Sequence, residues 1–185
     1  MSGHIAVIYT GRLTDVAIAL AEAASHIATQ VRTARLPGAD DREASAEPEA
    51  DLSYIEWADG IAFGTPAGTS GPASALMGFL DSSEPLWKNG RLYDKAVTVF
   101  TDEPERMAAD SILHPIYDAL YRWGAVIVGP RYFDLSSGKP AQPAEPGTTP
   151  DSGERLRAAQ YRGHRLARLA SVLAEERGRR ETLQL

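Results

Sequence analysis

The chain has no cysteine among its 185 residues. This absence excludes disulfide bonds, thiolate metal ligands and a cysteine nucleophile in one step. Histidine is also scarce: there are four, and no two of them stand at the sequence spacing of metal ligands. Carboxylates without histidines are a poor indication of a metal centre. The sequence therefore predicts no metal site.

Long apolar runs and an excess of basic charge are missing too. No apolar stretch approaches the roughly 20 residues that span a bilayer, and the first residues, "MSGHIAVIYT", lack the basic segment of a signal peptide. The net charge is −6, which disfavours non-specific binding to nucleic acid or to an anionic membrane surface. We therefore expect a cytoplasmic protein without nucleic-acid or membrane partners.

What is present is an alternation of strand-like and helix-like segments within an ordinary globular composition, 43% hydrophobic and 24% charged. Hairpin signals are missing, so the alternation predicts one α/β domain over residues 1–185, a three-layer sandwich around a five-stranded parallel sheet. The predicted strands are 5–9, 31–36, 61–64, 96–100 and 125–128. The predicted helices are 16–28, 52–57, 73–80, 105–123 (opened or kinked by Pro115) and 154–177. Residues 136–153 are expected to be a proline-rich irregular segment, and 178–185 a frayed tail.

Three loops follow strands of this sheet, at the edge where open α/β sheets bind their ligands. The first is "YTGRLTD". Its backbone amides, with Thr10, Gly11 and Thr14, could hold a phosphate at the start of the next helix, and Arg12 could add a guanidinium. The alternative is a tight strand-to-helix turn in which Thr14 is the N-cap.

The second and third loops differ in chemistry. In "GTPAGTSGP" three glycines would let the backbone approach a flat ligand, with hydroxyls from Thr65, Thr69 and Ser70, although it could equally be a flexible loop. In "TDEPERM" three carboxylates would repel a phosphate. We favour the interpretation that they cap the following helix.

One histidine stands close in sequence to the third loop. His114, just before Pro115, is therefore the candidate for an acid–base or substrate contact. The alternative is a histidine on the surface or in helix packing.

Several blocks resemble the WrbA family of flavodoxin-like NAD(P)H:quinone oxidoreductases. They are "FGTP" (63–66), "FLD" (79–81), "LWKNGRLYDKAVTVF" (86–100), "WGAVIVG" (123–129) and "AAQYRGHRLARLASVL" (158–173). The resemblance implies strand order 2-1-3-4-5, FMN at the carboxyl end of the sheet, and two-electron transfer from NAD(P)H to a quinone or similar aromatic acceptor. It also implies a homodimer or homotetramer.

The resemblance carries over to particular residues. It implies a cofactor site made of Thr10, Gly11, Arg12, Leu13, Thr14, Thr65, Pro66, Ala67, Gly68, Thr69 and Thr101. Trp87 matches the family's Leu-Trp motif, which implies a place at the subunit interface near a neighbour's flavin; alternatively it packs in the core. Trp123 replaces a family histidine and could fill space that the flavin would need.

The three loops also depart from the family pattern. The first is about two residues short, the second has "AGTSG" where the family has Thr-Arg-Phe-Gly-Asn, and only Thr101 matches in the third. This combination of matches to the family pattern and departures from it is compatible with three functions. The prediction is an FMN-dependent oxidoreductase with a reduced flavin site. The alternatives are a flavin-free enzyme that uses the crevice for a small aromatic substrate, and a non-catalytic binding or partner protein.

Overall fold

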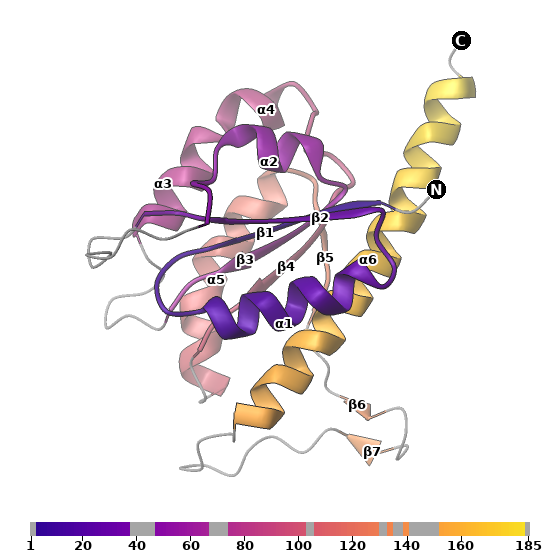
Figure 1. Ribbon diagram of the computed structural model, residues 1–185. Helices are drawn as coiled ribbons and strands as arrows, with labels where there is room; N and C mark the ends of the chain where they lie inside the picture. Colours follow the sequence, from indigo (N-terminus) through magenta and orange to yellow (C-terminus); the bar gives the residue numbers. More distant parts are fainter. Residues whose placement is uncertain are drawn as a thin grey trace.

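A five-stranded parallel sheet forms the centre of the molecule (Figure 1). The computed structural model describes residues 3–37, 47–66, 74–102, 106–129, 133–134, 139–140 and 152–183. The strand order is β2-β1-β3-β4-β5, which confirms the predicted fold class and order. The strands are β1 (His4–Tyr9), β2 (Gln30–Arg35), β3 (Gly60–Gly64), β4 (Ala96–Phe100) and β5 (Val126–Ile127).

The apolar content of each strand follows its place in the sheet. All residues of β3 and β4, and all but the first of β1, are buried because helices cover both faces of the central strands. Strand β2 lies at the edge and its sequence "QVRTAR" is mostly exposed or half-buried. The register pairs Ile5 with Val31 on one side and with Gly60 on the other.

Helices form a layer on each face of the sheet (Figure 1). On one face, α1 (Thr14–Ser25) and α6 (Ser152–Leu183) pack on side chains that include Val7, Ala62 and Phe100. On the other face, the core is built around Ile8, Phe63 and Val99. It is covered by α2 (Leu52–Trp57), α3 (Ser74–Ser82), α4 (Glu84–Lys88) and α5 (Arg106–Arg122).

Two features of these helices differ from the sequence expectation. Helix α4 was not expected; Pro85 is compatible with its first turn, where an amide has no helical acceptor to lose. Pro115 lies inside α5 and does not open it, since the helix is continuous from Arg106 to Arg122.

The C-terminal helix is longer than predicted. Residues 178–183, expected as part of a frayed tail, belong to α6. Arg180 pairs with Asp94 at 3.3 Å and with Glu176 at 3.3 Å, and the Thr182 hydroxyl donates to the Gly178 carbonyl at 2.8 Å. These contacts hold the last turns in the helix.

The described residues of the proline-rich segment, 136–153, include a strand and the first two residues of α6. Strand β7 (Lys139–Pro140) pairs antiparallel with β6 (Phe133–Asp134). The sequence predicted no strand there, because proline removes an amide donor and is confined to the margins of sheets. Residues 135–138 and 141–151 lie outside the described residues.

A buried lysine ties the amino end of β4 to α2. Lys95 is 6% exposed. Its ammonium group donates to the carbonyl oxygens of Ile55 (2.8 Å), Glu56 (2.7 Å) and Ala58. These are the last carbonyls of α2 and its C-cap, which have no helical donor of their own. The charge therefore caps the helix from within the core.

The same end of the sheet is joined to α6. Arg177 forms an ion pair with Asp59 and donates to the Asp94 carbonyl at 2.7 Å. In the described part of the chain no helix has the length and apolarity needed to cross a membrane.

Candidate functional site

The candidate site lies at the carboxyl ends of β1, β3 and β4, where the sheet itself brings three loops together. The Thr10 amide donates to the Gly64 carbonyl at 3.1 Å, and the Thr65 amide donates to the Phe100 carbonyl at 3.1 Å. Thr10 and Thr65 are buried, and Thr101 follows Phe100 directly. These two backbone amides are therefore used by the sheet and are not available to a ligand.

The first and second loops touch at Gly11 and Pro66. Gly11 has a φ of +70°, a conformation that costs glycine least. A β-carbon at position 11 would lie 2.9 Å from Cγ of Pro66. Arg35 of β2 donates to the Gly11 carbonyl at 3.4 Å. The short turn is thus held from both sides.

The N-cap residue of α1 provides no side-chain hydrogen bond to the start of the helix. The N-cap residue is Leu13, which is buried and has no side-chain acceptor, whereas Thr14 is already the first helical residue. The prediction of Thr14 as N-cap is therefore wrong, because the turn closes one residue earlier. The Val16 amide donates to Asp15 Oδ1 at 2.9 Å, and the Ala17 amide to the Leu13 carbonyl at 2.8 Å.

The backbone amides of residues 11–15 are consequently free of acceptors within the described structure. They stand at the N-terminus of a 12-residue helix. Free amides and the positive end of the helix dipole together favour an anion. Arg12 is exposed and adjoins these amides, so its guanidinium can add a positive charge to the turn.

An acidic group lies close to the same turn. The Tyr9 hydroxyl donates to the Glu47 carboxylate and lies 3.1 Å from Thr14 Oγ1. Burial, together with this hydrogen bond, raises the pKa of Tyr9 to about 12. Sequence reasoning missed both residues. Tyr9 ends a strand directly before Thr10, which was the available signal, whereas nothing local distinguishes Glu47 from the other acidic residues around it.

The remaining loop residues are only partly described. The Thr65 hydroxyl lies 3.4 Å from the Pro66 carbonyl, and the Thr101 hydroxyl lies 3.4 Å from Asp102 Oδ1. Ala67, Gly68, Thr69 and Ser70 of the second loop lie outside the described residues, and so do Glu103 and Glu105 of the third loop. Helix α5 begins at Arg106, within the segment quoted above as the third loop.

His114 does not lie at the start of α5. It is exposed, about 12 Å along the helix axis from Arg106. In the described residues no group of three or more acidic or histidine side chains is arranged for a metal ion.

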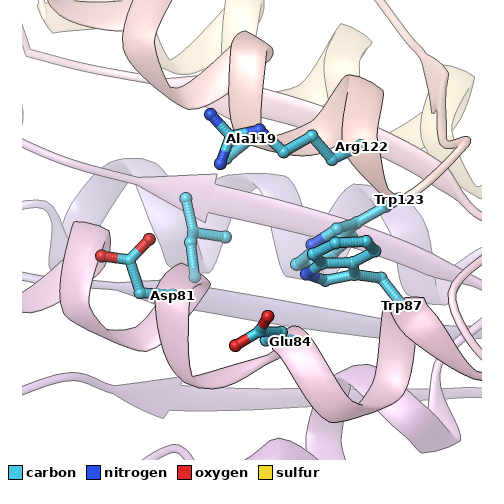
Figure 2. Close-up of a pocket in the computed structure, with 7 residues that line it drawn as sticks. Asp81, Glu84, Trp87, Ala119, Arg122 and Trp123 are labelled. Atoms are coloured by element: carbon cyan, nitrogen blue, oxygen red, sulfur yellow. The ribbon is translucent and has the colours of Figure 1, made fainter.

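The two tryptophans face a different cavity, of about 260 Å³ (Figure 2). Trp87 belongs to α4 and Trp123 follows α5, so both precede strands and lie toward the amino ends of the sheet. Trp123 is 3% exposed and its ring meets Phe63 edge-on, with centroids 5.9 Å apart. The other lining residues are Leu80, Asp81, Glu84, Ala119 and Arg122. The structure thus brings Trp87 and Trp123 together, on a different part of the molecule from Gly11 and Pro66.

Comparison with known proteins gives relatives at low identity. No protein-family model matches the chain. A protein of Paracoccus denitrificans named NAD(P)H dehydrogenase (quinone) is 24% identical over 193 residues, 91% of this chain and 93% of the relative. A protein of the same name from Deinococcus radiodurans is 32% identical over 88 residues, 47% of this chain. That match spans only 44% of the Deinococcus relative.

Among solved structures, a flavodoxin, WrbA-like protein from Agrobacterium tumefaciens has a TM-score of 0.64 and 22% identity. The match covers 91% of this chain and 98% of that one. This likeness shows a flavodoxin-like fold. With the two relatives, it confirms the resemblance to WrbA-like and quinone-dehydrogenase proteins that the sequence blocks predicted.

Proposed function

We propose that the protein is an NAD(P)H:quinone oxidoreductase of the flavodoxin fold, with the phosphate of FMN bound at the N-terminus of α1. The observation that carries this proposal is the row of amides at residues 11–15, which have no acceptor among the described residues and adjoin a helix whose N-cap residue, Leu13, makes no side-chain cap. A phosphate is the ligand that such an end favours. The names of the two relatives support the NAD(P)H and quinone substrates.

The residues present fit the phosphate end of the cofactor. The amides of Gly11 and Leu13 and the guanidinium of Arg12 would hold the phosphate, and Thr65 and Pro66 would adjoin the rest of the cofactor. When bound, FMN supplies the chemistry of accepting electrons from NAD(P)H and passing them to the quinone.

The protein's own contribution is to hold the turn in one shape. Pro66 packs against Gly11, and Arg35 holds the Gly11 carbonyl, so the amides that follow keep their direction. An anion site whose donors are already in place loses little conformational freedom on binding.

Several sequence expectations stay part of this proposal. They are a cytoplasmic location, a homodimer or homotetramer with Trp87 at the interface, ligand contacts from Thr14 and Thr101, and an acid–base role for His114. Contacts from residues 67–69 belong to it as well.

A second candidate, a flavin-free protein that binds a small aromatic substrate in the crevice, is favoured by one observation. Glu47 is bonded to Tyr9, whose hydroxyl lies 3.1 Å from Thr14 at the first position of α1. A carboxylate near the turn repels a phosphate and does not repel a neutral ring. The other alternative, a non-catalytic binding or partner protein, would also lack the flavin but would turn over no substrate.

An FMN titration separates the two candidates. Under the first, the purified protein takes up FMN and shows the oxidised-flavin absorption near ~450 nm, and NADH or NADPH then reduces a benzoquinone. Arg12→Ala should weaken FMN binding about tenfold through the loss of a charge-assisted hydrogen bond. Arg179→Ala, which alters an exposed arginine of α6, is the matched control and should leave the affinity unchanged.

A protein that takes up no FMN at about 100 μM, well above typical cofactor affinities, would exclude the first candidate. A screen of small aromatic compounds by thermal unfolding would then test the second, because a bound ligand raises the melting temperature.

A further inference from the structure

Two histidines from opposite ends of the chain meet on the surface formed by α1 and α6. His26 is the residue at the C-terminal cap of α1, and His164 belongs to α6. Nδ1 of His26 lies 3.5 Å from Nε2 of His164. The ring centroids are 5.7 Å apart, at an interplanar angle of 66°. Both side chains are exposed.

The helix packing beside them is tight and holds the backbones that carry the two imidazoles close together. Gly163 faces the backbone of α1: a β-carbon there would lie 2.2 Å from the Leu20 carbonyl oxygen and 3.1 Å from the Ala24 amide nitrogen. Only a residue without a side chain allows this approach. His164 follows Gly163 directly, and His26 follows Ala24 by two positions, so both rings project from backbone in contact.

At 3.5 Å the two ring nitrogens form at most a long and weak hydrogen bond. Hydrogen bonds from N–H groups have donor–acceptor distances of about 2.7–3.2 Å. Two imidazole nitrogens bound to one tetrahedral zinc ion, each at about 2.0–2.1 Å, stand about 3.3–3.4 Å apart. The observed separation is therefore close to that of two ligands of one metal ion. Within the described residues, neither ring has another hydrogen-bond or ion-pair partner.

We propose that His26 and His164 bind a divalent first-row transition-metal ion such as Zn²⁺ between α1 and α6. Imidazole is a preferred ligand of Zn²⁺, Cu²⁺ and Ni²⁺. Because the described residues hold no cluster of three or more ligand side chains, water completes the coordination. The bound ion joins the two helices on one face of the sheet and so resists their separation. This site is independent of the proposed function at the carboxyl edge.

The test uses the untagged full-length chain and ZnCl₂ as the probe. Titration calorimetry should show one Zn²⁺ per chain. Thermal unfolding should shift upward by roughly 5–10 °C when free Zn²⁺ is about a hundred times its dissociation constant. His26→Gln and His164→Gln should each abolish both signals. Arg165→Gln, which alters the exposed residue next to His164, should keep them.

Because both histidines are exposed, the glutamine variants should fold, and circular dichroism checks this. Zinc binding that survives in both variants would overturn the proposal, as would a wild-type protein that takes up no zinc at about 1 mM, far above the affinity of a functional site. Loss of binding in only one variant would also overturn it, since the site requires both rings.

Discussion

Gly11 lies directly against Pro66, so close that a β-carbon at position 11 would stand 2.9 Å from Cγ of the proline. The two residues belong to loops that follow β1 and β3, which are neighbours in the sheet. Their contact joins the two loops, and the amides of residues 11–15, which have no acceptor among the described residues, follow in the first loop and the start of α1. The shape of the proposed phosphate site therefore depends on the absence of a side chain at this position.

Gly11→Ala should lower both stability and FMN affinity. Alanine at a φ of +70° costs about 1–2 kcal/mol, and the contact with Pro66 adds to it. Urea denaturation and FMN titration measure the two effects. Gly78→Ala is the matched control, because a β-carbon at 78 meets nothing and alanine favours the α3 helix by about 0.5–1 kcal/mol. Unchanged FMN affinity in Gly11→Ala would argue against the turn as the phosphate site.

Glu47→Gln should strengthen FMN binding several-fold. The substitution removes the negative charge of the Glu47 carboxylate, which is hydrogen-bonded to Tyr9 close to Thr14 at the start of α1. The amide oxygen of the new glutamine can still accept a hydrogen bond from the Tyr9 hydroxyl. At a half-buried position, one such charge changes the interaction with a phosphate by about 1 kcal/mol. Glu49→Gln, at an exposed residue two positions away, should have little effect. Equal FMN affinity in wild type and Glu47→Gln would show that this carboxylate does not act on the ligand.

Lys95→Met should destabilise the protein and remove a pH dependence. Burial, with a smaller effect from Arg177, lowers the pKa of Lys95 to about 8 from its ordinary value of 10.5. Between these values the unfolded chain holds a proton that the folded chain has released, so the contribution of Lys95 to stability rises with pH. Methionine also leaves the carbonyls at the end of α2 without their donor, which costs about 1–3 kcal/mol.

The measurement is the free energy of unfolding of wild type and variant between pH 8 and pH 10. The difference between them should grow with pH, by at most about 1.4 kcal/mol per pH unit. Lys88→Met, at an exposed lysine paired with Glu84, is the control variant measured in the same way. A constant difference for Lys95→Met would mean that Lys95 keeps its ordinary pKa in the folded protein.

Trp123→Phe should cost about 1–3 kcal/mol of stability without changing FMN affinity. The indole is buried against Phe63 and lines the cavity near α4, away from Gly11 and Pro66. Its loss leaves unfilled volume in the core. Trp87→Phe, at a half-buried position on the same cavity, should cost less stability. A marked change of FMN affinity in Trp123→Phe would show instead that this side chain reaches the flavin space.

The main elements of the fold could be predicted because their signals are local. The apolar run "AVTVF" gives β4 with the predicted bounds, and residues 52–57 form α2 as expected. Helix α4 was missed because five residues are too few to show a helical period. The end of α6 was missed because ion pairs to a residue distant in sequence hold it, as Arg180 does with Asp94.

The candidate site was predictable only in its position. The loop "TGRLTD" indicates a phosphate turn by composition, but its donors depend on which residue begins the helix. The structure places Leu13 at the N-cap and bonds Thr14 to Tyr9, so the amides stay free while the hydroxyl is engaged. The composition of a loop shows which hydrogen-bond donors it contains. Only the packing of the folded chain decides which of these donors remain available to a ligand.

By itself the sequence determined the parallel sheet, its two covering layers and the edge at which a ligand would bind, because apolar periodicity and strand–helix alternation act over neighbouring residues. The tertiary structure alone decided the contacts between distant segments. It placed Pro66 on Gly11, Glu47 on Tyr9, and His164 beside His26. The two histidines show no ligand spacing in the sequence, and they meet because Gly163 lets α6 approach the backbone of α1. Such pairs depend on the packing of whole elements, which no local pattern of residues specifies.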